Sequence, residues 1–465
     1  MLRRLYAPEY LIKENLRLGE LPSTREAYES VFGVTWAAIA ETFMIAMIAL
    51  VSTVMVSSVG ESAVAAVGLV SQPRFIVQAM VLSVNMAITS ICARRRGQGD
   101  KYGALTCLKQ GLVLNVVLSA MLSGVAFIVS EPLLWLVGAQ DDTFPIALEF
   151  LHILLLGLPL SNLSLTITAA QRGVGRTKAS MRINTIASVS SLIFNYLLIN
   201  GVWIFPQLGV RGAAIGTVIG WAIGLMVALL SITHPNGFFN ILSPDGWKPE
   251  RQTLSSIYKV ASGSFLEQFC MRLGLLLYTI IIAGLGTVML AAHIILQSIM
   301  TLSFAFGEGY SIAASAMVGA NLGMKRPDLS MLYAKILQRI SFVSSIIMCF
   351  VFIFAGRNIM TLFTRSEEIL AVGTNILILM GALAIIHASQ LIFMGSLRGA
   401  GDTRYVAVIS FISIVFVRQI LAYVLVYPVG LGLMGAWLAF YGDQLVRLTL
   451  TYLRFRSGKW SRIEL

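Results

Sequence analysis

One seven-residue stretch of this chain occurs twice. The first copy is Arg172-Gly173-Val174-Gly175-Arg176-Thr177-Lys178, and the second is Arg398-Gly399-Ala400-Gly401-Asp402-Thr403-Arg404. The two copies lie 398 − 172 = 226 residues apart. The same shift pairs further residues: Glu41 with Glu267, Phe43 with Phe269, Thr53 with Thr279, Gly60 with Gly286, and Gly97 with Gly323. So many matches in one register indicate that the chain contains two copies of one unit.

The composition places both copies in a membrane. Hydrophobic residues make up 57% of the chain and charged residues 12%, and the mean hydropathy is +0.82, outside the range of soluble globular proteins. Apolar runs of spanning length recur near residues 34–57, 63–92, 104–128, 145–169, 180–200 and 212–232, and then near 257–283, 288–318, 331–355, 369–396, 405–427 and 434–453. A long repeat inside an apolar chain is typical of membrane transporters.

This pattern predicts an all-α integral membrane protein with twelve transmembrane helices in two six-helix lobes. An even number of spans returns each copy to the side on which it started, so the lobes should be related by a pseudo-twofold axis along the membrane normal. We expect five parts: a cytoplasmic N-terminal segment (1–32), the N-terminal lobe (33–232), a cytoplasmic linker (233–256), the C-terminal lobe (257–453) and a cytoplasmic tail (454–465).

The distribution of basic residues predicts the orientation. Bases gather in the turns after even-numbered spans, at 94–96, 172–182, 248–259 and 325–326, and in the tail. The opposite turns are poor in bases, which predicts that both termini are cytoplasmic in a multi-pass protein of the plasma membrane. The net charge of +12 is then the positive-inside bias, and we expect no nucleic-acid partner. The expected partners are the lipid bilayer and small-molecule substrates, with the chain acting as a monomer.

Two stretches lie outside the expected spans. Residues 1–32 mix bases with acids and contain no apolar core of signal-peptide length. Leu11, Ile12, Leu16 and Leu18 could form a short amphipathic stretch on the membrane, and a solvated tail is the alternative. The stretch 234–256 contains Pro-Asn-Gly and Pro-Asp-Gly turn sequences and is expected to link the lobes.

The chain lacks the usual signals of a cofactor or a metal. Its four cysteines, Cys92, Cys107, Cys270 and Cys349, have no paired spacing, so we expect neither disulfides nor a metal site. No Gly-Lys-Ser/Thr phosphate loop is present, which argues against ATP-driven pumping by this chain. We expect no enzymatic activity and no cofactor; the energy should come from a gradient of protons or sodium ions.

The chain resembles the multidrug and toxic compound extrusion (MATE) family from about residue 34 to 460. The resemblance rests on the order and spacing of several motifs: the duplicated Arg-Gly-x-Gly-x-Thr turn, Gly284-Leu285-Gly286 followed by Ala291-Ala292-His293, Gly319-Ala320-Asn321-Leu322-Gly323, and the stretch Leu453 to Trp460. It implies two six-helix lobes around a central cavity that opens alternately to either side. It also implies export of organic, often cationic, compounds in exchange for sodium ions or protons.

Charged residues inside the expected spans are candidates for function, because charge at bilayer depth is costly and normally faces water or a partner. The alternative for each is a structural polar group bonded to a neighbouring helix. For Asp443 and Arg447, four residues apart, we expect an intrahelical ion pair. Arg418 is expected to satisfy a neighbouring backbone group.

Glu267 is the leading candidate for the cation-coupling residue. The resemblance places a cation-binding glutamate in the first span of the second lobe, where Glu267 stands as a lone carboxylate in an apolar stretch. Its repeat mate Glu41 is the next candidate, and the pairing of the two also fits a structural role. Where sodium-coupled members add an acid in the tenth span, this chain has His387, which should assist Glu267.

The first lobe departs further from the family pattern. The resemblance leads us to expect an aspartate before Thr53 and another four residues after Asn195, but Ser52 and Ile199 stand there. The first lobe therefore lacks the two aspartates expected for a carboxylate site, and coupling through the second lobe is favoured. Because one glutamate and one titratable histidine make a poor sodium cage, the residues favour protons over sodium.

Six residues are expected to line the substrate cavity: Arg74, Glu308, Arg272, His293, Asn195 and Tyr278. Arg74 and Glu308 occur in one lobe only, since their repeat positions are Met300 and Leu82. Arg74 could meet an anionic or zwitterionic substrate, or pair with Glu41 or a helix end. Glu308 could hold the ammonium group of a cationic drug.

The duplicated turns are expected to be structural. Arg172, Gly173 and Gly175, and Arg398, Gly399 and Gly401, should form tight cytoplasmic connections between the fourth and fifth spans of each lobe. Glycine lets the backbone reverse there, and the bases should anchor it on the inner leaflet.

Two other functions remain open at this point. A flippase or exporter of a lipid-linked or dedicated metabolite would need a cavity lined with many bases, whereas Arg74, Arg272 and Arg418 are the available ones. A membrane scaffold or receptor would need neither intramembrane acids nor histidines.

Overall fold

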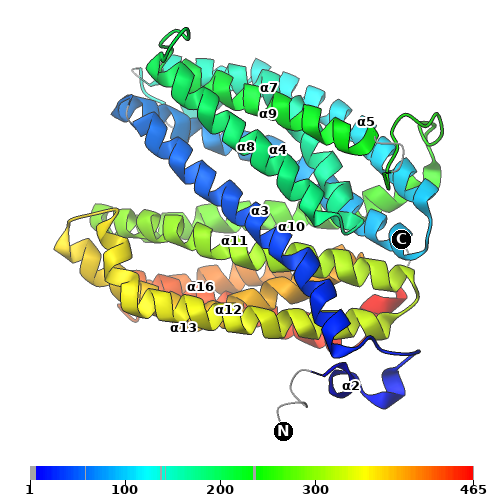
Figure 1. Ribbon diagram of the computed structural model, residues 1–465. Helices are drawn as coiled ribbons and strands as arrows, with labels where there is room; N and C mark the ends of the chain where they lie inside the picture. The colour runs from blue at the N-terminus through cyan, green and yellow to red at the C-terminus, as the bar shows by residue number, and fades with distance from the viewer. Residues whose placement is uncertain (1–6, 58, 137–138, 142, 234–236, 464–465) are drawn as a thin grey trace. The chain divides into compact units, whose positions relative to one another are not determined.

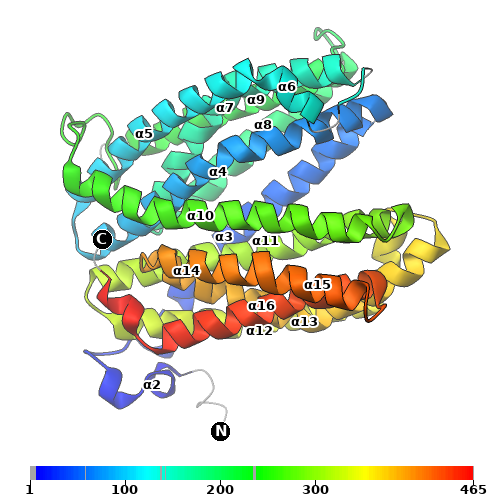
Figure 2. The same cartoon turned by 180° about the vertical axis from the view of Figure 1, so that it is seen from behind.

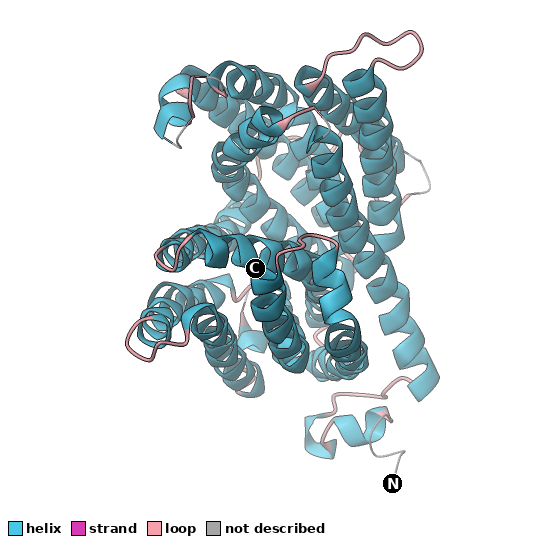
Figure 3. Ribbon diagram, turned by 90° about the vertical axis from the view of Figure 1, so that its left-hand side faces the viewer, coloured by secondary structure: helices cyan, strands magenta, loops and turns pink. Residues whose placement is uncertain are grey.

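The computed structural model describes residues 7–57, 59–136, 139–141, 143–233 and 237–463. Within these ranges helices joined by turns and loops make up the chain, and there is no strand (Figure 3). Twelve long helical segments coincide with the twelve expected spans: α3 (Thr24–Ser57), α4 (Glu61–Gly97), α5 (Lys101–Ile128), α7 (Phe144–Gly173), α8 (Thr177–Asn200), α9 (Val210–Thr233), α10 (Arg251–Ala283), α11 (Thr287–Gly323), α12 (Pro327–Thr361), α13 (Glu367–Gly399), α14 to α15 (Thr403–Val426) and α16 (Gly432–Arg456). Two short helices, α2 (Pro8–Leu11) and α6 (Ser130–Leu136), were not expected.

Length and composition make these helices suited to a membrane. Among the described residues, ten helices are long and apolar enough to cross a bilayer. The two long helices outside that set are α4 and α16, and α16 carries Asp443 and Arg447 near its middle. The eleventh segment is not a regular α-helix: α14 (Thr403–Ser410) continues through a π-helical stretch, η2 (Phe411–Val417), into α15 (Arg418–Val426).

The chain folds into two compact units. The first unit comprises Ala40–Ala261, and the second comprises Met1–Ile39 together with Ser262–Leu465. The boundaries fall inside α3 and α10, so the first sixteen residues of α3, Thr24 to Ile39, belong to the second unit.

The two units use the same helix packing. In the first unit, α4, α5 and α7 pack on one another, and α9 packs on α7 and α8. In the second unit, α11, α12 and α13 pack on one another, and α16 packs on α13 and α15. Figure 1 shows α12, α13 and α16 running alongside each other, and Figure 2 shows α14, α15 and α16 in the same way. The repeat seen in the sequence is therefore a repeat of helix order and of helix neighbours.

The duplicated turn lies at the expected position in each unit, and its two glycines have different structural roles. It joins α7 to α8 in the first unit and α13 to α14 in the second. The backbone reverses at the second glycine, since Gly175 has φ +72° and Gly401 has φ +85°. The first glycine instead allows close helix contact: a Cβ on Gly173 would lie 2.5 Å from the Thr89 carbonyl oxygen, and one on Gly399 would overlap the Ser315 carbonyl. Thr89 and Ser315 are themselves repeat mates, 226 residues apart.

This close contact predicts a large effect of Gly399→Leu. The new side chain would be forced against the backbone of α11, and overpacking of this kind costs about 1–3 kcal/mol or more. We expect a lower thermal midpoint in detergent and less protein in the membrane fraction. Gly124→Leu is the matched control, because nothing lies within 4 Å of a Cβ built on Gly124 of α5. Equal losses in the two variants would contradict this assignment.

Part of the segment before α3 docks on α12, whereas Leu16 and Leu18 remain 44% and 61% exposed. Leu11 and Ile12 are 6% and 2% exposed, in one hydrophobic cluster with Leu332 and Ile336 of α12. Three hydrogen bonds fix the segment: Lys335 Nζ donates to the Leu11 carbonyl at 2.6 Å, the Leu18 amide to Asp328 at 3.2 Å, and Arg326 to the Glu20 carbonyl at 3.0 Å. Leu11 and Ile12 thus have a docking surface on α12 that the sequence does not reveal.

The stretch expected to link the lobes lies against the first unit. Lys109 Nζ of α5 donates to the backbone carbonyls of Ser243 and Asp245, at 2.5 Å and 2.6 Å, and lies 5.0 Å from the centre of the Trp247 ring. Gln110 donates to the Lys248 carbonyl at 3.0 Å. The described part of this stretch is therefore fixed to α5.

Candidate functional site

Glu267 of α10 is not a lone carboxylate. Arg398, at the C-terminal end of α13, donates from Nε to Oε2 of Glu267 at 3.2 Å and from Nη2 to Oε1. The Glu267 side chain is 0% exposed and that of Arg398 is 10% exposed. The two charges thus form a bidentate, buried ion pair, which is the geometry that best compensates their loss of hydration.

The first unit repeats this pair. Arg172 Nη1 donates to Oε1 of Glu41 at 2.9 Å. Glu41 is 131 residues before Arg172, and Glu267 is 131 residues before Arg398. In each unit the pair ties the first long helix to the start of the duplicated turn. The sequence motif and the intramembrane glutamate are therefore two halves of one structural element.

This pairing corrects the expectation for the two arginines. We expected Arg172 and Arg398 to anchor the turns on the inner leaflet, but both side chains are largely buried and point to carboxylates. These arginines are buried because a carboxylate inside an apolar helix needs a counter-charge, and the repeated arginine lies beside the glutamate in both units.

The surroundings of the two pairs differ. In the first unit, Ser180 and Asn184 of α8 also donate to Oε1 of Glu41, at 2.9 Å and 2.6 Å. In the second unit, Arg398 Nη1 donates to Ser311 Oγ of α11 at 3.4 Å. Glu308 lies three residues before Ser311 on α11 and is exposed. Neutral donors on α8 thus bind the glutamate of the first pair, whereas a serine on α11 contacts the arginine of the second.

His387 lies away from the Glu267–Arg398 contacts. Its ring stacks on Phe304 at a centroid distance of 3.6 Å, and in the described part of the chain neither ring nitrogen makes a hydrogen bond. His387 lines a cavity of about 330 Å³ in the second unit. The cavity wall is mostly aromatic, aliphatic and methionine side chains from α11, α12, α13 and α16.

A second cavity, of about 410 Å³, lies in the first unit. It is bounded by α3, α4, α7, α8 and α9. Ser52, which stands where the family resemblance led us to expect an aspartate, lines this cavity. Asn195, which the resemblance retains, lines it as well. Asn184, which donates to Glu41, is also in its wall. Ile199, by contrast, packs in the hydrophobic core and is 3% exposed.

The other residues expected to line a substrate cavity lie in different surroundings. Tyr278 and His293 are 2% exposed and pack together at 5.5 Å between ring centres, outside the walls of both cavities. Arg272 is exposed on α10, and Glu308 is exposed on α11. The side chain of Arg74 lies outside the described residues.

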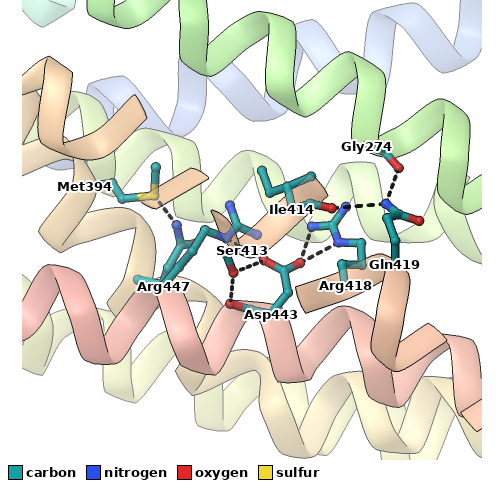
Figure 4. Close-up of polar contacts among 9 residues, drawn as sticks. Gly274, Met394, Ser413, Ile414, Arg418, Gln419, Asp443 and Arg447 are labelled. Carbon is teal, nitrogen blue, oxygen red and sulfur yellow. Dashed lines mark hydrogen bonds and ion pairs between the residues drawn. The ribbon is translucent and has the colours of Figure 1, made fainter. Parts of the chain in front are cut away.

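A buried charge cluster surrounds Asp443 of α16 (Figure 4). Arg447 Nε donates to Oδ1 of Asp443 at 2.7 Å, and Arg418 Nε to Oδ2 at 2.5 Å. The intrahelical pair with Arg447 was predicted and is confirmed. Arg418 was expected to bond a backbone group, but it binds the carboxylate, because α15 and α16 pack side by side and bring it there. Ser413, in the π-helical stretch η2, also donates to Asp443.

The sequence profile of the MatE family matches this chain twice, at residues 37–197 and 264–424. The chain belongs to the MatE family. The two matches are 264 − 37 = 227 residues apart, close to the 226-residue repeat. The resemblance seen in the sequence is therefore confirmed, and the MatE chain is a multi-pass membrane transporter.

Relatives of this MatE chain cover nearly its full length. The uncharacterized transporter YisQ of Bacillus subtilis is 27% identical over 438 residues, which span 93% of this chain and 94% of YisQ. A probable multidrug resistance protein NorM of Thermotoga maritima is 25% identical over 460 residues, covering 97% and 96% of the two chains. A solved multidrug resistance MATE transporter in an outward-facing conformation has a TM-score of 0.87 at 20% identity, covering 93% of this chain and 95% of that chain. The last likeness shows that the fold is shared.

Proposed function

We propose that this chain is a secondary antiporter that exports small organic molecules across the plasma membrane in exchange for protons or sodium ions. Both termini would lie on the cytoplasmic side, where the basic turns are. The coupling carboxylate is Glu267. The observation that carries this proposal is the buried Glu267–Arg398 pair, which joins the first helix of the second unit to the turn that follows α13.

The pair can convert ion binding into movement. A proton or sodium ion on Glu267 would remove the negative charge that holds Arg398. Arg398 already donates to Ser311, and Glu308 lies three residues earlier on the same helix, so these groups would offer it a second position when Glu267 is neutralised. Since Arg398 stands at the start of the duplicated turn, its release would loosen the junction of α13 and α14.

Glu308 fits a role on the transport path. It is exposed near the middle of α11, a helix long and apolar enough to span a bilayer. A carboxylate at such depth is too costly to face lipid, so its environment should be hydrated. The second unit would thus supply a paired acid for coupling, Glu267, and an exposed acid on α11, Glu308.

Export from cells tests the proposal first. Cells that express the chain are loaded with a panel of fluorescent organic compounds, and efflux is followed before and after an ionophore dissipates the proton or sodium gradient. We expect at least one compound to leave faster than from cells without the chain, and this difference to vanish with one of the two ionophores. Efflux that resists both ionophores would argue against an antiporter.

A further inference from the structure

One face of α12 differs by a single charge from the matching face of α5 in the first unit. Three valines on this face of α5 are 49%, 42% and 57% exposed: Val113, Val116 and Val117. Their repeat mates on α12, 226 positions later, are Arg339, Phe342 and Val343. Phe342 and Val343 are again exposed and apolar. An exposed apolar stripe on a helix of spanning length is a surface for lipid, and in the second unit Arg339 interrupts this stripe.

The lysine one turn before Arg339 has a structural role in both units. Lys335 and Lys109 are repeat mates. Lys335 Nζ donates to the Leu11 carbonyl at 2.6 Å, and Lys109 Nζ donates to the Asp245 carbonyl at 2.6 Å. Each lysine thus holds the segment that leads into the first long helix of a lobe. Arg339 lies four residues after Lys335 and on the same side of the helix, but its repeat mate is an uncharged valine.

Arg339 lacks the counter-charge that the structure gives to other intramembrane arginines. Its Nη1 is buried and makes no hydrogen bond among the described residues. The ion pairs of the described part of the chain do not include Arg339, whereas Arg398 and Arg418 of the same unit each bind a carboxylate. A guanidinium inside the expected span 331–355 is costly without a partner. Arg339 is therefore available for an anion from outside the chain.

Arg339 lines a groove of about 670 Å³ in the second unit. The wall contains Tyr28 of α3, Ser389 of α13, and Gln338, Arg339, Phe342 and Val343 of α12. Gln338 Nε2 donates to the Ser389 carbonyl at 3.0 Å and so fixes α12 to α13 at the groove. Arg339 is the charged residue among the described residues of this wall. The groove thus joins one guanidinium to exposed aromatic and aliphatic side chains.

This combination matches the two parts of an anionic phospholipid. A phosphate accepts paired hydrogen bonds from a guanidinium, and an acyl chain would cover the exposed Phe342 and Val343. A soluble anion would leave these two side chains uncovered. A choline headgroup would bring a second positive charge close to Arg339 and weaken the attraction. Basic pockets between spanning helices on the cytoplasmic side are typical sites for anionic headgroups.

We propose that this groove binds an anionic phospholipid, with its phosphate on Arg339 and an acyl chain along Phe342 and Val343. The arginine stem can extend along the helix toward the headgroup region. In the proposed orientation α12 begins on the cytoplasmic side, after the basic turn at 325–326, so the lipid belongs to the cytoplasmic leaflet. The choice of leaflet rests on that orientation, but the binding itself does not.

Lipid binding to the purified protein in a nonionic detergent, followed by native mass spectrometry, tests the site. The probes are phosphatidylglycerol and phosphatidylcholine with the same acyl chains. We expect phosphatidylglycerol to bind at least about tenfold more tightly. Glycerol 3-phosphate carries the phosphate without acyl chains and should not displace the lipid at about 1 mM.

Three variants make the result specific. Arg339→Val installs the residue of the first unit, and Arg339→Gln keeps a polar side chain of similar length. Each should lower the affinity for phosphatidylglycerol at least about tenfold, to that for phosphatidylcholine. Arg182→Gln removes an exposed arginine of α8 and is the matched control, which should keep the preference.

Four results would overturn the inference. They are equal binding of the two lipids to the parent protein, a preference for phosphatidylglycerol that survives in folded Arg339 variants, an equal loss of that preference in Arg182→Gln, and displacement of the lipid by glycerol 3-phosphate. Export without this lipid preference refutes the site alone, whereas the preference without export refutes the transport function alone.

Discussion

Asp443→Asn is expected to cost the protein about 3–5 kcal/mol of folding free energy, because it leaves two buried guanidinium groups without their counter-charge. The Asp443 side chain is 0% exposed, and those of Arg418 and Arg447 are 7% and 6% exposed. All three lie where α15 and α16 pack together (Figure 4). Asparagine keeps the shape of the side chain but not its charge, so the loss isolates the electrostatic contribution. The thermal midpoint of the purified variant in detergent, read from its monodispersity, measures it.

A surface pair provides the control for this variant. Arg357 and Glu367 form an ion pair at 3.1 Å, but their side chains are 66% and 78% exposed. Because exposed pairs contribute about 0–1 kcal/mol, Glu367→Gln should leave the thermal midpoint nearly unchanged. An Asp443→Asn protein as stable as the Glu367→Gln protein would mean that the cluster is not buried as described.

Glu267→Gln is expected to abolish gradient-driven export while leaving the protein in the membrane. Glutamine retains the size of the side chain and can still accept a hydrogen bond from Arg398, but it can no longer gain and lose a positive ion. The expected loss is at least about a hundredfold in the initial export rate, which corresponds to about 2.7 kcal/mol. The rate is measured in proteoliposomes with an imposed proton or sodium gradient.

Glu41→Gln is the matched control, because it removes the same charge from the same place in the first unit. Glu41 also accepts hydrogen bonds from Ser180 and Asn184, which hold its position without Arg172. We therefore expect Glu41→Gln to keep most of the coupled export rate. Loss of coupling in Glu41→Gln with export retained in Glu267→Gln would move the coupling site to the first unit.

The repeat and the twelve helices could be predicted because both follow from local patterns in the sequence. Apolar runs separated by turns give the helices, and the duplicated Arg-Gly-x-Gly-x-Thr stretch gives the register of the two copies. The packing of the N-terminal segment could not be predicted, because Leu11 and Ile12 are buried against a hydrophobic surface of α12 that forms only in the folded protein. The same holds for the glycines of the turn: only the structure shows that Gly173 and Gly399 serve helix contact and that Gly175 and Gly401 serve the reversal.

The sequence identified the carboxylates of the candidate site but not the arginines that bind them. Glu267 and Glu41 were recognised because a carboxylate in an apolar helix is conspicuous, but their arginines lie 131 residues away, and such pairs are set by packing. Arg418 was misassigned for the same reason, since its partner Asp443 is on the next helix.

The most direct test of the transport account is reciprocal exchange in proteoliposomes that contain the purified parent protein and no ATP. An outward gradient of an exported compound is imposed with no ion gradient, and movement of protons and of sodium ions is recorded with internal indicators. The antiporter account predicts that one of these ions moves against the compound, that the movement stops when the compound gradient is spent, and that Glu267→Gln abolishes it. Passage of the compound with no movement of either ion, or ion movement that is the same in Glu267→Gln, would contradict it.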